Sequence, residues 1–140
     1  MTTERQLTVS AQVKNLAKIA EFIGKAATQA GLDDKATYDI QMATDEACTN
    51  IIEHAYGGEG KGSIQLTCHV QEEGLQVVIL DQGSISFDPT QVPPLDVRAP
   101  LSERQRRGMG LFFIHNLVDT VEFKLNTPQG NQLILFKRKA

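Results

Sequence analysis

Tryptophan is absent from this chain, and aromatic residues make up only 6% of its 140 residues. Cysteine is scarce: Cys48 and Cys68 have no partners at metal-ligand spacing, which is typical of buried, reduced thiols. No apolar run approaches membrane-spanning length. The opening residues, MTTERQLTVS, also lack the basic and apolar regions of a secretory signal. We therefore expect a cytoplasmic protein with no membrane-spanning segment.

An excess of positive charge is missing as well. The formal net charge of -3 at pH 7 argues against a protein that binds nucleic acid, because such proteins are usually basic. The hydrophobic content of 41% is normal for a soluble globular protein. A length of 140 residues is close to the most common domain size, and no internal repeat is present. The sequence therefore predicts a single domain that spans residues 1–140.

Apolar residues recur at helical spacing in two segments of the first half of the chain. The first segment, residues 13–30, ends at Gly31, a residue type that often terminates a helix in the left-handed conformation. The second begins at Asp33 or Asp34, which are preferred N-cap residues, and ends in the glycine-rich stretch 57–60. Its apolar stripe comprises Ile40, Ala43, Ala47 and Ile51. Each segment predicts an amphipathic helix that packs on the core.

Apolar and polar residues alternate in four later segments, which is typical of half-buried strands. Residues 64–70 and 75–81 flank a Glu-Glu-Gly turn and predict a hairpin. Residues 121–125 and 130–139 flank a second turn and predict another hairpin. The sheet is therefore expected to be built mainly from antiparallel pairs.

Three further segments complete the predicted organisation. A short strand is expected at residues 7–9 and a third helix at about residues 110–118. Residues 83–108 show no clear period and contain four prolines, so this long loop is either functional or disordered. The order of elements predicts an α+β fold. We expect a two-layer α/β sandwich in which helices pack on one face of a mostly antiparallel mixed sheet.

The second predicted helix carries the first group of candidate functional residues. Its segment ATDEACTNIIEHAY sets Glu46, Asn50 and His54 four residues apart, so their side chains share one helix face. A carboxylate there can accept a proton, and a carboxamide oxygen can help to hold a hard cation such as magnesium. Glutamate and asparagine also occur together on ordinary solvated helix faces. The pair alone leaves both interpretations open.

Asp81 and Gly83 lie where the second predicted strand of the first hairpin ends. An aspartate at this place can accept a hydrogen bond from an exocyclic amine. A glycine nearby lets a ligand ring approach the backbone closely. The alternative is a simple Asp-x-Gly turn without a ligand.

The segment Gly108-Met109-Gly110-Leu111 opens the third predicted helix. Glycines before a helix allow its first amide groups to surround an anion, and the helix dipole adds favourable potential. Three arginines lie just upstream and either add positive charge near a phosphate or form a solvated basic run: Arg104, Arg106 and Arg107. The segment lacks the lysine of a P-loop and the strand-glycine-helix unit of a dinucleotide fingerprint.

Taken in order, these elements closely resemble those of the GHKL ATPase superfamily, whose ATP site is known as the Bergerat fold. Within it, the best match is the small bacterial anti-sigma factor and serine-protein kinase family, and the resemblance spans nearly the whole chain. DEACTNIIEHAY resembles the N box, DQGSISFDP the first glycine box, and RRGMGLFFIHNLVD the second. The resemblance implies the same fold, with ATP and Mg²⁺ as ligands.

The resemblance also implies a role for each matching residue. Glu46 resembles the general base that activates the attacking hydroxyl, and Asn50 resembles the asparagine that links magnesium to the triphosphate. Asp81 looks like the adenine-reading carboxylate, with Gly83 beside the ring, and residues 84–107 look like the ATP lid. The implied phosphate-contacting segment comprises Gly108, Met109, Gly110 and Leu111.

Two residues of these segments receive no firm role. His54 falls inside the N box, where a packed or capping histidine is expected. Asn131 stands where many relatives place a threonine near the adenine, and an asparagine can hydrogen-bond there as well. The first glycine box also continues with Ser84-Ile85-Ser86 instead of a second glycine.

The function implied by the resemblance is that of a serine/threonine protein kinase that is also an anti-sigma factor. Its expected substrate is an anti-sigma factor antagonist (a STAS-type protein), which competes with a sigma factor for the kinase. A homodimer is implied, with no direct contact to nucleic acid or membrane. Four alternatives stay open: an ATP-binding module without phosphoryl transfer, a kinase for another target, a histidine-kinase catalytic domain, and an ATPase that uses water.

Overall fold

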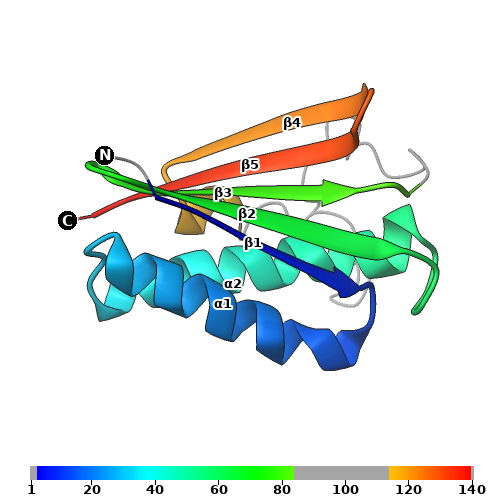
Figure 1. The fold of residues 1–140 in the computed structure, drawn as a ribbon, viewed down its shortest axis with the longest axis horizontal. Coiled ribbons are helices and arrows are strands. Elements are labelled where there is room, and N and C mark those ends of the chain that lie inside the picture. Colours follow the sequence, from blue (N-terminus) through cyan, green and yellow to red (C-terminus); the bar gives the residue numbers. More distant parts are fainter. Residues whose placement is uncertain (1–2, 84–113, 140) are drawn as a thin grey trace, which may run out of the picture.

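Five strands and two long helices form two layers in the part of the chain that the computed structural model describes, residues 3–83 and 114–139 (Figure 1). A 3₁₀ turn precedes the first helix, and a π-helical segment continues the second. In chain order the elements are β1 (Thr3–Ser10), η1 (Val13–Asn15), α1 (Leu16–Gln29), α2 (Asp34–Asn50), η2 (Ile51–Ala55), β2 (Ser63–Gln71), β3 (Gly74–Asp81), β4 (Thr120–Thr127) and β5 (Gly130–Arg138).

The sheet has the strand order β1-β2-β3-β5-β4, and every pairing among these described strands is antiparallel. Alternation in the sequence determines which side chains face the helices. In β3, for example, Leu75, Val77 and Ile79 are fully buried, whereas the residues between them are partly exposed. Because β5 lies between β3 and β4, the β4–β5 hairpin joins the β2–β3 hairpin through the pairing of β5 with β3.

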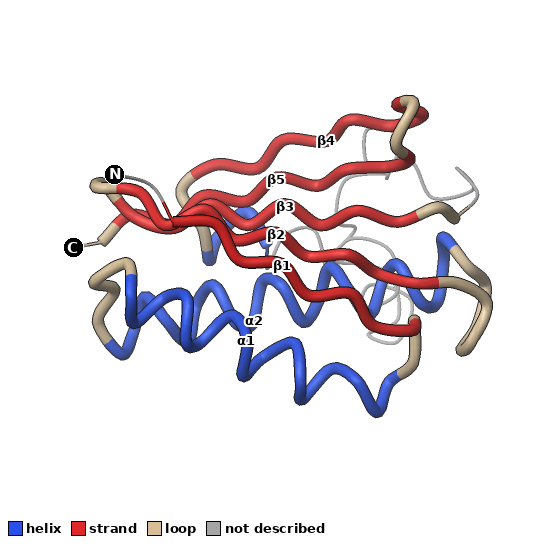
Figure 2. Tube along the Cα trace, viewed as in Figure 1, coloured by secondary structure: helices blue, strands red, loops and turns tan. Residues whose placement is uncertain are grey.

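Helices α1 and α2 cover one face of the sheet (Figure 2). Ile23 of α1 and Ile40 of α2 are fully buried between the layers. Gly31 connects the two helices with a φ of 84°, a conformation that glycine adopts without a Cβ clash. Asp33 caps α2, since its carboxylate accepts a hydrogen bond of 2.8 Å from the backbone N–H of Ala36.

The predicted fold class is confirmed, with helices on one face of an antiparallel sheet. β1 is longer than the strand expected at residues 7–9, and the first predicted helix divides into η1 and α1. Residues 114–117 are helical and form the described part of the third predicted helix, whereas residues 110–113 lie outside the described residues. Within the described ranges, no helix is long and apolar enough to cross a membrane.

Candidate functional site

α2 carries Glu46 and Asn50 on the flank of its buried face. The helix is regular through Asn50, so the two side chains lie one turn apart, or about 6 Å along the axis. Ala43 and Ala47 of the same helix are buried against the core, while Glu46 and Asn50 are each half-buried. Because both side chains are only partly buried, a ligand bound beside the helix can contact them.

A π-helical segment follows α2 directly, and the sequence did not predict it. The backbone N–H of Tyr56 donates to the carbonyl of Ile51 at 2.9 Å, which is a hydrogen bond across five residues. Such segments are rare and frequently occur at functional sites. His54 lies within η2 and is half-buried. Regular α-helical geometry therefore ends at Asn50, the candidate metal ligand, one turn after the candidate base Glu46.

The environment of Glu46 raises the pKa of its carboxyl group. Burial raises the pKa of Glu46 above its ordinary value of 4.5, and the negative charges of Asp45 and Glu53 raise this pKa further. Burial also raises the pKa of Asp45 above 3.8. Once ionised, a carboxylate with a raised pKa is a better proton acceptor than an ordinary one.

Asp81 lies at the end of β3, is only 6% exposed, and has its carboxylate fixed by two hydrogen bonds to the same oxygen. Gly83 N lies 2.8 Å from Asp81 Oδ1, and Asn131 Nδ2 lies 3.1 Å from it. Asn131 also donates to the carbonyl of Gly83 at 3.2 Å and accepts from the N–H of Asn126 at 3.1 Å. No described residue donates to Oδ2 of Asp81. This oxygen can accept a hydrogen bond from the amino group of a ligand.

Tyr56 ties the end of the helical segment to the end of β3. Its hydroxyl donates to the carbonyl of Ser63 at 2.6 Å and accepts from the N–H of Gln82 at 2.8 Å. Gly83 packs so closely on η2 that a Cβ at this position would lie 2.6 Å from the carbonyl oxygen of Ala55. A glycine is therefore required here by packing alone. These contacts bring the end of the N-box helix (α2 and η2) next to the end of β3 at Asp81.

Sequence reasoning missed a lysine that connects three elements. Lys137 Nζ on β5 lies 3.2 Å from Asp39 Oδ2 on α2 and 2.7 Å from the carbonyl oxygen of Leu117. Burial would raise the pKa of Asp39, but hydrogen bonds and charge from Lys35 and Lys137 outweigh it and hold the pKa below 3.8. Leu117 ends the short helix 114–117, which lies within the segment that resembles the second glycine box. Lys137 therefore anchors that helix to α2.

Several predicted site residues lie outside the described part of the chain. They are the lid segment 84–107 and the phosphate-contacting residues Gly108, Met109, Gly110 and Leu111. Their roles stay predictions. Ile114, just beyond them, is 1% exposed and belongs to the core.

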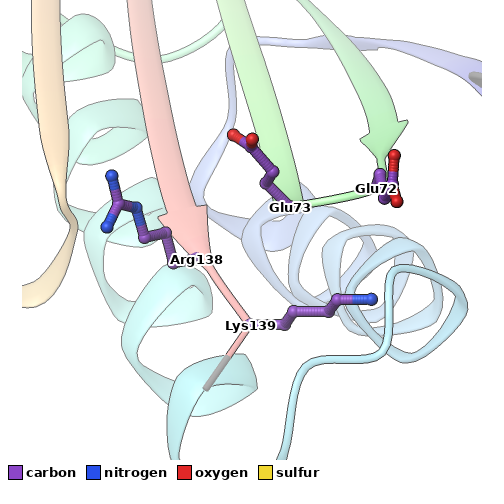
Figure 3. A pocket seen from close by; sticks show the side chains of 4 residues that line it. All are labelled: Glu72, Glu73, Arg138 and Lys139. Carbon is purple, nitrogen blue, oxygen red and sulfur yellow. The ribbon is translucent and has the colours of Figure 1, made fainter.

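The opposite end of the sheet holds a hollow of about 490 Å³, lined by Glu72, Glu73, Arg138 and Lys139 (Figure 3). These side chains come from the β2–β3 turn and the end of β5, and they point in different directions. Two acidic and two basic groups give this hollow no net charge to attract an ion. None of the predicted site residues lies here.

The two cysteines take no part in the candidate site chemistry. Both are free and buried, as the sequence indicated. Burial is the main reason that the pKa of Cys68 rises to about 12. Burial, with the negative charges of Asp45 and Asp81, also raises the pKa of Cys48. Both thiols are therefore protonated and unreactive at neutral pH.

The donor atoms present fit a magnesium-nucleotide ligand. Asn50 and Glu46 offer oxygen atoms, which Mg²⁺ prefers, and Asp81 offers an acceptor suited to an amino group. Within residues 3–83 and 114–139, no group of three or more histidine, cysteine, aspartate or glutamate side chains could hold a metal ion.

Comparison with known proteins decides the family. Residues 9–137 match the model of the histidine kinase-like ATPase domain family. The chain belongs to this family. Membership implies the use of ATP, in agreement with the arrangement of Asp81 and the N-box helix.

Curated relatives narrow the assignment to one branch. The chain is 36% identical to serine-protein kinase RsbW of Halalkalibacterium halodurans, over 75% of this chain and 70% of the relative. It is 34% identical to the RsbW of Listeria innocua, over 79% of this chain and 71% of the relative. This similarity makes the chain a member of the serine-protein kinase family that the sequence motifs indicated.

A solved structure supports the fold. A crystal structure of the RsbU and RsbW domains of a Mycobacterium tuberculosis protein matches with a TM-score of 0.67 and 18% identity. The match covers 97% of this chain and 32% of that chain. It therefore confirms the architecture of the histidine kinase-like ATPase domain.

Proposed function

We propose that this protein transfers the γ-phosphoryl group of Mg²⁺-bound ATP to a serine or threonine hydroxyl of an anti-sigma factor antagonist, with Glu46 as general base. The observation that carries the proposal is the half-buried pair on α2, in which Glu46 has a raised pKa and Asn50 follows one turn later. A carboxylate with a raised pKa can accept the proton of a hydroxyl group, and a carboxamide oxygen close to it can help to hold a metal-bound triphosphate.

Each residue then has one task. Glu46 accepts the proton of the attacking hydroxyl, and Asn50 orients the metal and the triphosphate. When bound, Mg²⁺ offsets the charge that develops on the transferred phosphoryl group. Asp81 accepts a hydrogen bond from the adenine amino group through the oxygen that Asn131 and Gly83 leave open. The phosphate contacts come from residues 108–111, with 84–107 as a lid.

The proposed cellular setting is a partner-switching system, in which the kinase holds a sigma factor until unphosphorylated antagonist displaces it. The similarity to serine-protein kinases named RsbW supports the kinase part of this proposal. We further propose that the protein is a homodimer and that it acts in the cytoplasm. A kinase with the same core that acts on a target other than a sigma factor is the alternative for the partner.

The decisive experiment compares transfer with binding. Labelled ATP, magnesium and antagonist proteins from the same genome are incubated with the wild type, Glu46→Gln and Asn50→Ala at pH 8. Glu46→Gln should lower the transfer rate about 100-fold or more and keep ATP affinity, because general-base catalysis contributes that much. Asn50→Ala should lose Mg²⁺-dependent ATP binding. Glu72→Gln, an exposed glutamate at the other end of the sheet, is the matched control and should behave as the wild type.

Two results would change the assignment. Full transfer by Glu46→Gln would remove Glu46 as the base. ATP binding by the wild type without transfer to any antagonist would instead favour a regulatory ATP-binding module.

A further inference from the structure

Two large apolar side chains are exposed on the same helix row as the candidate base. Tyr38, Met42, Glu46 and Asn50 follow one another at four-residue spacing within α2, and residues at this spacing lie along one ridge of a helix. Tyr38 is 60% exposed and Met42 is 37% exposed. Apart from Val13, they are the only large hydrophobic side chains classed as exposed within residues 3–83 and 114–139. We call Tyr38 and Met42 the α2 ridge.

The contacts of α2 explain why this ridge faces away from the protein. On one side, Gln41 Nε2 donates to the carbonyl of Ala20 on α1 at 2.9 Å. On the other side, Asp39 binds Lys137 of β5. The helix is therefore held on both flanks and along its buried face. The α2 ridge lies between the flanks and contributes nothing to the core.

We propose that the α2 ridge is the docking surface for the protein that carries the acceptor hydroxyl. The inference rests on the proposed function, because it takes Glu46 as the proton acceptor. Met42 lies about 6 Å and Tyr38 about 12 Å from Glu46 along the helix axis, given a rise of 1.5 Å per residue. A stable protein interface covers about 800 Å² on each partner, a patch roughly 30 Å across. A folded acceptor whose hydroxyl reaches Glu46 therefore has room to cover both residues.

The chemistry of the ridge indicates the chemistry of the partner. Tyrosine and methionine are enriched at the centres of protein interfaces, where they fill apolar pockets. Asp45 and Glu53 carry negative charge close to Glu46. The matching acceptor surface should thus present apolar side chains beside its serine or threonine, with a basic group near the hydroxyl. An acceptor protein that docks on the α2 ridge would then place its hydroxyl next to Glu46 in the same step.

The test separates binding of the acceptor from binding of ATP. Tyr38→Ser and Met42→Gln are compared with Val13→Ser, which removes an apolar side chain that is 55% exposed and belongs to η1, not to α2. The substrate is an antagonist protein from the same genome that the wild type phosphorylates. Each ridge variant should raise the KM for this protein about tenfold, as expected for a side chain at the centre of an interface. The KM for ATP should not change, and Val13→Ser should match the wild type.

A second measurement uses the wild-type protein alone. Oxidation of Met42 by peroxide is followed by mass spectrometry with and without the antagonist, in the presence of ADP and magnesium. Bound antagonist should slow the oxidation of Met42 several-fold, because a covered thioether is shielded from the oxidant.

The outcomes distinguish the two proposals. If the wild type phosphorylates the antagonist while both ridge variants keep its KM and Met42 stays unprotected, the ridge is not the docking surface and the kinase assignment stands. If the wild type phosphorylates no antagonist, the proposed function fails, and the ridge fails with it as an acceptor surface.

Discussion

Asn131 on β5 donates a hydrogen bond to the carboxylate of Asp81 on β3, with Asn131 Nδ2 3.1 Å from Asp81 Oδ1. The two residues are directly opposite each other in the sheet register. Asn131 also holds Gly83 and the backbone of Asn126, where β4 departs from regular pairing. The amide thus fixes the orientation of the candidate adenine-reading carboxylate from the neighbouring strand.

Replacement of Asn131 by alanine should therefore weaken ATP binding and destabilise the fold. Asp81 and Asn131 are both buried, so the loss of the amide leaves hydrogen-bonding groups without partners. Unpaired buried groups cost about 1–3 kcal/mol, and an Asp81 carboxylate that is held only by the Gly83 N–H should bind ATP about tenfold more weakly. Calorimetric titration with ATP and thermal unfolding measure the two effects.

Gln132→Ala is the control for this prediction, because Gln132 is the next residue of β5 and its side chain lies on the opposite face of the sheet. It should keep wild-type ATP affinity. Equal ATP affinities for Asn131→Ala and Gln132→Ala would contradict a role for the amide in the nucleotide site.

The raised pKa of Glu46 predicts the pH dependence of phosphoryl transfer. A base must be ionised, so kcat/KM should fall as the pH is lowered through the pKa of Glu46, with a midpoint above 4.5. Glu53 contributes to that elevation through its charge, so Glu53→Gln should move the midpoint to lower pH. The measurement is a kcat/KM profile between about pH 4.5 and pH 8, a range in which the acid limb is visible.

The prediction concerns the pH at the midpoint of the acid limb, and it makes no statement about the value of kcat/KM on the plateau. Glu72→Gln removes an equal charge far from the helix and should leave the midpoint where it is. An unchanged midpoint in Glu53→Gln would mean that Glu46 does not control the acid limb.

Local patterns allowed much of the fold to be predicted from the sequence. Period-two alternation identified β2, β3 and β5 because one face of the sheet is buried and the other is more exposed. Gly31 and Asp33 marked the boundary between the helices because each has a backbone or capping task that few residues can perform. Glu46 and Asn50 could be placed on one face since helical spacing is regular there.

Contacts between distant segments were not predictable in the same way. Alternation does not reveal that β5, and not β4, lies beside β3, so the pairing of Asp81 with Asn131 depends on the assembled sheet. The π turn after Asn50 also has no distinct apolar period. Lys137 and Asp39 are 98 residues apart, and only the folded chain brings them together.

Lys137 and Lys35 give a matched test of that long-range contact, since both ammonium groups bind Asp39 Oδ2. Lys35 Nζ lies 3.0 Å away with a side chain 85% exposed, and Lys137 Nζ lies 3.2 Å away with a side chain 17% exposed. Lys137→Met should lower the free energy of unfolding by about 1–3 kcal/mol at pH 7, because it removes the more buried of the two cations at Asp39 and leaves the Leu117 carbonyl without its hydrogen-bond donor. Lys35→Met should cost less than about 1 kcal/mol, as expected for an exposed ion pair.

The pH dependence of this difference follows from the pKa of Asp39, which is held below 3.8 in the folded protein. A carboxyl group with a lowered pKa adds stability above its ordinary pKa, and that contribution is lost as the pH falls through the folded value. The destabilisation by Lys137→Met should therefore be larger at pH 7 than at pH values below 3.8. Urea unfolding of the wild type and both variants across this range measures it. Equal losses for Lys35→Met and Lys137→Met at pH 7 would contradict the prediction, because they would show that the burial of Lys137 and its hydrogen bond to Leu117 add no stability.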